Sequence, residues 1–210
     1  EFTRFAHKPS HYASWLQPLF RDILQARIYD LAIETPLEQM SDLSSKLGHR
    51  VYLKREDLQP VFSFKLRGAY NRIRQIPQER LTQGIVCASA GNHAQGVAMA
   101  AQKLGIRAII VMPVTTPEIK VSSVRARGGE VVLHGDTFDQ ALVKAKEYEQ
   151  QGMEFIHPYD DMAIIAGQGT VGMEILRQSP EDLHAVFVPV GGGGLLAGVS
   201  AYIKSLQAQV

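Results

Sequence analysis

Short apolar runs alternate with amphipathic stretches along most of this chain. Strand candidates are apolar runs of four to six residues bounded by polar or turn residues, and they are 51–54, 85–88, 108–112, 131–134 and 185–190. Helix candidates keep hydrophobic residues three and four positions apart, and they are 66–76, 92–105, 136–148 and 195–206. The strand spacing leaves room for a crossover helix each time, so the pattern predicts an α/β fold with parallel sheets flanked by helices.

The residues before the first strand also show helical spacing. Pro36 suits the first position of a helix and Gly48 suits its end, which predicts a helix over 36–48. Within the first 30 residues, hydrophobic side chains from Trp15 to Leu24 recur at helical spacing. We interpret that segment as a helix that packs on the core, with a role in an interface as the alternative.

Composition and charge exclude several classes of protein. Of the 210 residues 45% are hydrophobic and 20% charged, as in an ordinary globular protein, and the net charge is +1. Nothing here favours binding to nucleic acid or to an anionic membrane surface. No apolar run reaches the length of a membrane span, about 18 residues. Cys87, the single cysteine, lies in a strand-like apolar run, so we interpret it as a buried structural thiol.

Four consecutive glycines, Gly191 to Gly194, lie between the run 185–190 and a helix candidate that begins at Leu195. Without Cβ atoms, the backbone can turn sharply and direct several amides at one anion. The helix that follows adds its dipole. One or two glycines would suffice for a tight turn, so we expect the loop to bind phosphate. No Gly-Lys-Ser/Thr follows, so the loop is not a nucleotide P-loop.

Lys65, in SFKLRGA at 63–69, is the candidate nucleophile. A lone lysine is usually a solvated surface charge. Here the flanking Phe62, Phe64 and Leu66 would lower the local dielectric and depress the pKa of the amine, as a Schiff-base lysine requires. Lys54 is the rival, but three charged residues follow it directly.

The segment SAGNHAQG at 89–96 follows the strand candidate 85–88. In parallel sheets, ligands bind beyond the carboxyl ends of the strands. Small residues let a ligand approach the backbone, and amides at a helix start can hold a carboxylate. Asn92 can cap the helix and can also bond a ring hydroxyl. We favour a structural role for His93. Lysine, helix start and glycine loop together suit pyridoxal phosphate, which carries an aldehyde and a phosphate.

Other site chemistries find little support in the sequence. A literal G-x-G-x-x-G occurs at Gly167, Gly169 and Gly172, but no acidic residue follows a strand at the required distance, so we interpret these glycines as helix-packing residues rather than an NAD site. No H-E-x-x-H or G-x-S-x-G is present, so we expect neither a metal site nor a serine hydrolase. The histidines and acids considered as metal ligands are His7, His11, His157, Asp160 and Asp161.

The motifs SFKLRGAYN, SAGNHAQGVA and PVGGGGLLAGV, in this order, resemble those of the pyridoxal-phosphate enzymes of the tryptophan synthase β-like fold. With KREDLQPVFSFKLRGAYN and VMPVTTPEIKV, the chain from about residue 28 onward most resembles the biosynthetic threonine dehydratases (threonine ammonia-lyases). The resemblance implies a two-lobed fold. Residues 1–60 and 160–210 would belong to the larger cofactor-binding lobe, which is truncated here, and 61–159 would form the smaller lobe.

The resemblance also implies roles for individual residues. Lys65 would be the Schiff-base lysine and the base that removes the Cα proton of the substrate. The other cofactor-binding residues would be Phe64, Asn92, Gly191, Gly192, Gly193, Gly194 and Leu195, of which Asn92 would meet the ring hydroxyl and 191–195 the phosphate. The substrate carboxylate would be held by Ser89, Ala90, Gly91, Asn92 and His93.

The implied reaction is the conversion of L-threonine to 2-oxobutanoate and ammonia, the first step of isoleucine biosynthesis, in a homo-oligomer. A serine dehydratase or serine racemase of the same fold, and a non-catalytic fragment, remain alternatives. In the family, later residues supply a hydroxyl facing the pyridine nitrogen and a regulatory C-terminal domain. The chain starts with Glu1 and ends after a helical pattern at Val210, so we expect a fragment or processed product that alone binds cofactor and turns over poorly. We expect a cytoplasmic location, with an organelle after transit-peptide removal as the alternative.

Overall fold

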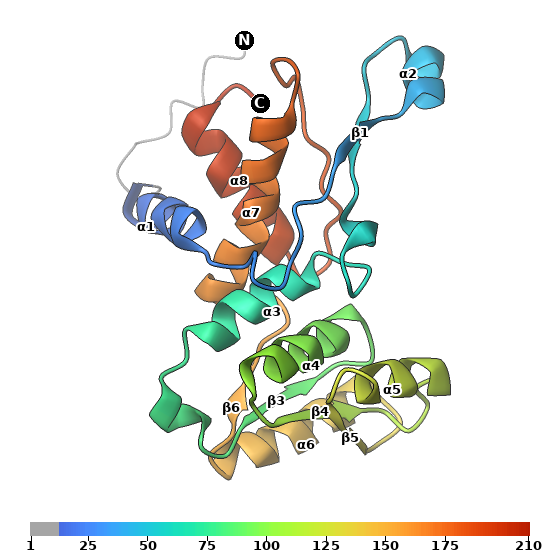
Figure 1. The fold of residues 1–210 in the computed structure, drawn as a ribbon, viewed down its shortest axis with the longest axis vertical. Helices are drawn as coiled ribbons and strands as arrows, with labels where there is room; N and C mark the ends of the chain where they lie inside the picture. Colours follow the sequence, from blue (N-terminus) through green and yellow to red (C-terminus); the bar gives the residue numbers. More distant parts are fainter. Residues whose placement is uncertain (1–12) are drawn as a thin grey trace, which may run out of the picture.

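The computed structural model describes residues 13–210, and a parallel sheet forms its lower half in Figure 1. Four strands lie in the order β5-β4-β3-β6, and every neighbouring pair is parallel. Their bounds are β3 Ile85–Ala88, β4 Ala108–Met112, β5 Glu130–Leu133 and β6 Glu154–Phe155. The predicted α/β class is confirmed. The short β6 has no counterpart in the sequence prediction.

Helices cover both faces of this sheet. On one face lie α4 (Asn92–Leu104) and α5 (Glu118–Arg125), and on the other α6 (Phe138–Gln150). Because side chains alternate along a strand, Ile85 and Cys87 pack in the core with α4, while Val86 and Ala88 pack in the core with α6. All four side chains are buried, which explains why β3 is a continuous apolar run. The prediction of a buried Cys87 is confirmed.

A second body consists of three helices, seen in the upper half of Figure 1. They are α1 (Ala13–Gln25), α7 (Met162–Gln178) and α8 (Gly194–Leu206), and α3 (Lys65–Arg74) lies between them and the sheet. The two bodies agree with the two-lobed fold expected from the resemblance. The limits of the lobes at residues 60 and 160 stay a prediction.

Glycines of α7 permit close helix packing. A Cβ at Gly167 would lie 2.6 Å from the carbonyl oxygen of Arg67 on α3, and one at Gly172 would lie 3.0 Å from that of Val199 on α8. Gly169 faces the side chain of Ile23 on α1. The interpretation of this G-x-G-x-x-G as helix-packing glycines is therefore confirmed.

The helix predicted over 36–48 is wrong in its first half. Residues there form β1 (Leu37–Gln39), which pairs antiparallel with β2 (Tyr52–Lys54), and only then α2 (Ser41–Leu47). Strand pairing with β2 outweighs the local helical pattern, and α2 buries none of its residues. Gly48 does end the helix, with φ +66°. Two short 3₁₀ turns, η1 (Glu56–Leu58) and η2 (Gln78–Leu81), flank the start and end of the segment containing α3.

The strand predicted over 185–190 is absent from the structure. The segment has no partner strand among the described residues, and a strand is defined by the bonds to its neighbour. Phe187, apolar and expected to be buried, is 94% exposed, and Val190 is also exposed.

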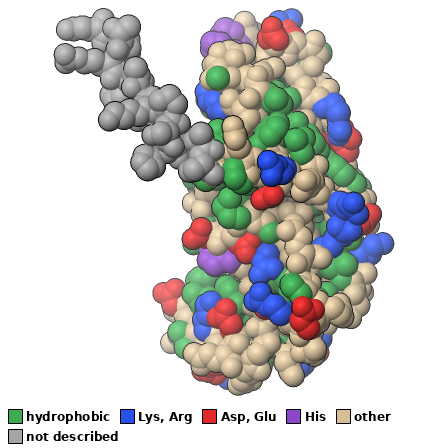
Figure 2. All heavy atoms as spheres, turned by 90° about the vertical axis from the view of Figure 1, so that its left-hand side faces the viewer, with side chains coloured by type: hydrophobic (Ala, Val, Ile, Leu, Met, Phe, Trp, Pro, Cys, Tyr) green, Lys and Arg blue, Asp and Glu red, His purple; other side chains and the backbone are tan. Residues whose placement is uncertain are grey.

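The described surface mixes charge types. On the face drawn in Figure 2, positive and negative side chains are interspersed, with hydrophobic ones between them. Among residues 13–210, no helix combines the length and apolar character needed to cross a membrane.

Candidate active site

Lys65 is the first residue of α3, and its amine lies in a partly buried position between two aromatic rings. The Nζ atom donates a hydrogen bond to the carbonyl oxygen of Pro158 at 2.7 Å. The ring centroids of Phe64 and Tyr159 lie 5.5 Å and 6.0 Å away. Within the described residues no carboxylate forms an ion pair with this amine, and burial lowers its pKa below the ordinary lysine value. A lysine with a weakened charge and no counter-ion is suited to act as a nucleophile or base.

The flanking residues contribute unequally to this environment. Leu66 is fully buried and Phe64 lies beside the amine, as expected. Phe62 is 70% exposed, so the expectation that it shields Lys65 is wrong. Its φ of +57° is the left-handed region, which turns the side chain outward before the chain enters α3.

Lys65 and the glycine loop line one cavity. The cavity has a volume of about 280 Å³ and is bounded by Phe64, Lys65, Tyr159 and residues 189–195. Within the described residues, the amides of 191–195 have no backbone or side-chain acceptor. They lie where α8 begins, at the positive end of the helix dipole. Free amides at a helix start and an amine across the cavity fit a ligand that carries both phosphate and aldehyde.

The four glycines do not share a single explanation. Gly193 has φ +88°, a conformation that other residues adopt at a cost. A Cβ at Gly192 would overlap the ring of Tyr159, and one at Gly194 would lie 2.8 Å from the carbonyl oxygen of that residue. Only Gly191 faces open space and has an unstrained φ. All four were expected to serve an anion, and packing against Tyr159 independently accounts for glycine at positions 192 and 194.

The SAGNH turn lies beside this cavity rather than in its wall. None of Ser89 to His93 is among the lining residues. The turn follows β3, and a Cβ at Gly96 of α4 would lie 3.3 Å from the backbone of Leu66 and Lys65. This close approach of α4 to the start of α3 keeps the turn near the amine.

Within the turn, the predicted cap is wrong. Gly91 occupies the N-cap position, no side chain caps the helix, and the exposed Asn92 is its first residue. The amide of Gly91 donates to Ser89 Oγ at 3.2 Å. Asn92 is thus free of a capping bond, so its amide group is available for a ligand.

His93 is buried behind the turn. Its Nε2 is bonded to the carbonyl oxygen of Ile156 at 3.0 Å. Burial, aided by the nearby charges of Lys65 and His157 and opposed by the hydrogen bond to Ile156, lowers the pKa of His93 to about 4. The ring is therefore neutral at neutral pH, which agrees with the structural role that sequence analysis favoured.

His157 and Asp161 have local hydrogen-bond partners, and Asp160 is bonded through its backbone amide. His157 Nδ1 accepts hydrogen bonds from the amides of Tyr159 and Asp160, at 3.3 and 2.8 Å. Asp161 caps α7 and accepts a hydrogen bond from Arg72 at 2.8 Å. No three metal-ligating side chains cluster anywhere in residues 13–210. His7 and His11, also considered as ligands, lie outside the described residues.

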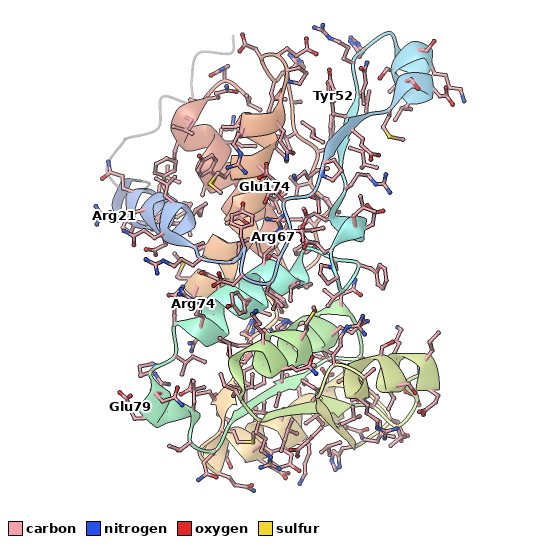
Figure 3. The ribbon with its side chains drawn as sticks, in the orientation of Figure 1. Arg21, Tyr52, Arg67, Arg74, Glu79 and Glu174 are labelled. Carbon is pink, nitrogen blue, oxygen red and sulfur yellow. The ribbon has the colours of Figure 1, made fainter. Side chains whose placement is uncertain are left out.

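A buried ion-pair cluster next to the site escaped sequence analysis. Arg67, two residues after Lys65, is 0% exposed, and so is Glu174 of α7, which faces it in Figure 3. The guanidinium donates two hydrogen bonds to Glu174, at 2.5 and 2.9 Å, and two to Glu56, both at 2.7 Å. Such bidentate geometry offsets much of the cost of burying the charges.

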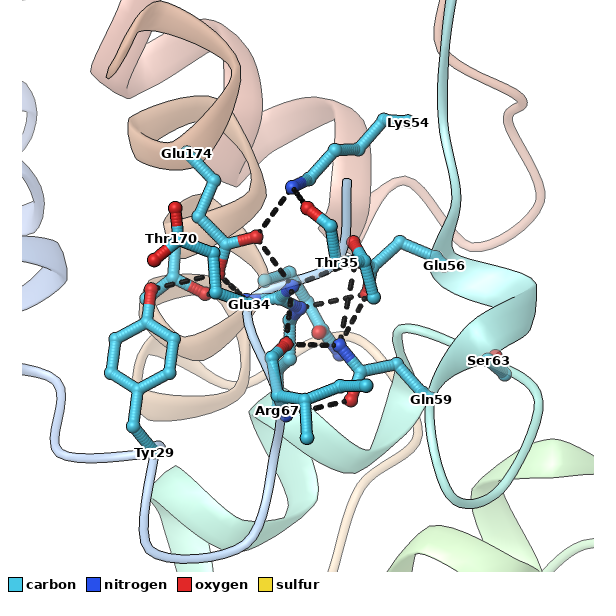
Figure 4. Close-up of polar contacts among 12 residues, drawn as sticks. Tyr29, Glu34, Thr35, Lys54, Glu56, Gln59, Ser63, Arg67, Thr170 and Glu174 are labelled. Atoms are coloured by element: carbon cyan, nitrogen blue, oxygen red, sulfur yellow. Dashed lines mark hydrogen bonds and ion pairs between the residues drawn. The ribbon is translucent and has the colours of Figure 1, made fainter. Parts of the chain in front are cut away.

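Lys54 completes this cluster, as Figure 4 shows. Its Nζ lies 2.6 Å from Glu174 and 2.9 Å from Gln178 Oε1, and it also donates to the carbonyl oxygen of Thr35. Two positive and two negative side chains thus balance, and Tyr29 donates a further bond to Glu174 at 2.7 Å. Lys54, the rival nucleophile, is held by a carboxylate, so Lys65 is the amine available for chemistry.

Comparisons with known proteins find a matching family and similar sequences. The family model described as "Pyridoxal-phosphate dependent enzyme" matches residues 28–210. A curated relative, the biosynthetic chloroplastic threonine dehydratase of Arabidopsis thaliana, is 60% identical over 190 residues, 90% of this chain and 32% of its own length. The chain thus spans about a third of that relative.

Solved structures are similar as well. The processed form of threonine deaminase isoform 2 from Solanum lycopersicum superposes with a TM-score of 0.91 at 54% identity, over 93% of this chain and 54% of that one. Maize serine racemase superposes with a TM-score of 0.87 at 34% identity, over 92% of this chain and 58% of that one.

Proposed function

The chain belongs to the pyridoxal-phosphate dependent enzymes, and we propose that it supplies the nucleophilic lysine and phosphate loop of a threonine ammonia-lyase. The reaction would convert L-threonine to 2-oxobutanoate and ammonia, at the start of isoleucine biosynthesis. The observation that carries the proposal is the cavity in which Lys65, without a carboxylate partner, faces the free amides of 191–195. The choice of threonine as the substrate rests on the relatives named threonine dehydratase and threonine deaminase.

We assign the cofactor-binding roles as follows. When bound, pyridoxal phosphate would supply the aldehyde that joins Lys65 and the ring that takes up electrons from the substrate. The amides of the glycine loop would hold its phosphate, Phe64 would lie beside its ring, and Asn92 would bond its hydroxyl. The uncapped start of α4 supports the last assignment, because the side chain of Asn92 has no hydrogen-bond partner among the described residues.

Lys65 would also move the proton at the substrate Cα. Its pKa is lowered by burial, so a larger share of the amine is unprotonated near neutral pH than for an exposed lysine. Pro158 holds the amine through a carbonyl oxygen, which accepts a hydrogen bond without adding a charge. The carboxylate of the amino-acid substrate would bind at Ser89 to His93, where α4 begins.

The direct test is chemical trapping in the complete natural polypeptide. Reduction with borohydride in the presence of pyridoxal phosphate, followed by peptide mapping, should place the modification on Lys65. Modification of Lys54 instead, or none at all, would contradict the assignment. Release of 2-oxobutanoate from L-threonine should exceed release of pyruvate from L-serine.

Serine racemase is the second candidate, because a solved serine racemase is 34% identical to the chain. Formation of D-serine, with little 2-oxobutanoate from L-threonine, would favour it. We further propose that the enzyme is a homo-oligomer, either cytoplasmic or in an organelle, since the plant relative is named as chloroplastic. Sedimentation and cell fractionation test these two points.

A further inference from the structure

The turn at 157–160 touches both ends of the cavity. Through the carbonyl oxygen of Pro158 it binds the amine of Lys65 at 2.7 Å. Through Tyr159 it contacts the glycine loop, because a Cβ at Gly192 would overlap the ring and one at Gly194 would meet the backbone of Tyr159. One short turn therefore contacts both the amine of Lys65 and the glycine loop.

Local contacts fix this turn in place. The Nδ1 atom of His157 accepts the amides of Tyr159 and Asp160, at 3.3 and 2.8 Å. The rings of His157 and Tyr159 meet edge to face, with centroids 4.8 Å apart at 83°. The Tyr159 side chain is nevertheless 39% exposed, and its hydroxyl has no hydrogen-bond partner among the described residues. The ring, rather than the hydroxyl, makes the contacts with the loop.

A loop of glycines needs such support. Four glycines in a row have more backbone freedom than any other sequence, so their amides would fluctuate unless something packs against them. Donors bind an anion best when their positions are already fixed, since no ordering cost is then paid on binding. Among the described residues that line the cavity, Tyr159 is the one whose ring overlaps the space that a Cβ would fill at Gly192.

We propose that Tyr159 is a positioning residue of the cofactor site, whose ring holds the glycine loop at the distance from Lys65 that a phosphorylated aldehyde requires. The proposal rests on the proposed cofactor. It concerns the phosphate end of the site, because Lys65 Nζ is held by the carbonyl oxygen of Pro158 at 2.7 Å, whereas the ring centroid of Tyr159 lies 6.0 Å away, at the outer limit of a cation–π contact.

The experiment compares two aldehydes, pyridoxal phosphate and pyridoxal, which lacks the phosphate. Their affinities for the complete natural polypeptide are measured from the absorbance of the lysine-bound form. Tyr159→Ala should weaken the binding of pyridoxal phosphate at least about tenfold, the size of one lost charge-assisted hydrogen bond. Binding of pyridoxal should change less than about twofold, well below that tenfold step.

Tyr159→Phe is the matched control, since it keeps the ring and removes a hydroxyl that has no partner. It should bind both aldehydes like the wild type. Tyr159→Leu, which retains apolar volume, serves if Tyr159→Ala fails to fold. An equal loss for both aldehydes, or no loss for either, overturns the inference alone. A wild-type protein that captures neither aldehyde overturns the proposed function, and this inference with it.

Discussion

Two lysines of this chain show how burial can serve stability in one place and chemistry in another. Lys54 and Lys65 are both sheltered, and burial lowers the pKa of both amines. Lys54 lies 2.6 Å from Glu174 in the cluster around Arg67. Lys65 has a carbonyl oxygen as its acceptor and a cavity beside it.

The difference lies in the partners rather than in the pKa. A buried amine held by a carboxylate stays charged and tied to its site, whereas one held by a carbonyl can lose its proton and move. Both regions share α3, in which Lys65 and Arg67 are two residues apart. The cluster holds α3 through Arg67, and α3 presents the amine of Lys65 to the cavity.

The largest expected effect comes from replacing each of the two lysines in a separate variant. Lys65→Arg keeps a positive charge but removes the nucleophile and base, so turnover should fall by at least roughly a thousandfold, as for a lost general base. Lys54→Met should leave borohydride trapping at Lys65 intact in the molecules that fold. Yellow colour and deamination that survive Lys65→Arg would remove the contrast between the two sites.

The second effect is on stability, and it belongs to the cluster. Arg67→Met leaves Glu174 and Glu56 without their main counter-ion, which should cost about 3–5 kcal/mol in the free energy of unfolding. Urea denaturation measures this loss. The control is Arg107→Gln, which breaks an exposed pair with Glu130 that is 2.8 Å long. Its urea midpoint should barely move. Equal losses of unfolding free energy in both variants would mean that the buried cluster contributes no more than an exposed ion pair.

The third prediction concerns how stability depends on pH through His93, which lies in the turn beside the cavity. Burial lowers the pKa of His93 from 6.5 to about 4, so the unfolded chain binds a proton more readily than the folded one between these values. Stability should therefore fall as the pH drops from about 7 to about 4, by an amount on the order of 3 kcal/mol. In His93→Gln this part of the pH dependence should disappear from urea titrations. An unchanged profile would place the acid sensitivity elsewhere.

The local sequence pattern was enough to predict the strands whose side chains are buried on both faces of the sheet. The prediction of β3 and β4 is confirmed residue for residue, because buried parallel strands are continuous apolar runs bounded by turns. The helix predicted over 66–76 is α3, which begins one residue earlier and ends two residues sooner, at Lys65 and Arg74, and the stop at Gly48 is confirmed. The wrong elements depend on partners: β1 forms by pairing with β2, and 185–190 lacks a neighbour among the described strands.

The site shows the same division between features set by the local sequence and features that depend on distant partners. Motifs identified Lys65 and the glycine loop, which the structure brings to one cavity. Tyr159 and the Arg67–Glu174 pair could not be found, because their partners are 33 or more positions away along the chain and no spacing rule connects them. No pattern singled out Arg67, because the amphipathic helix 66–76 also carries Arg72 and Arg74.

The smallest effect on stability separates the two uses of glycine in the loop. Gly191 faces open space, so Gly191→Ala should change the free energy of unfolding by less than about 0.5 kcal/mol. Its new methyl group would project beside the free amides and should weaken binding of pyridoxal phosphate. Gly192→Ala, one residue on, meets the ring of Tyr159 and should lose about 1–3 kcal/mol through overpacking. If Gly191→Ala instead destabilises the fold and leaves cofactor affinity unchanged, the loop is a packing element throughout. Lys65 would then face no anion site. The distinction between the cluster around Lys54 and the cavity beside Lys65 would depend on the partners of the two lysines alone.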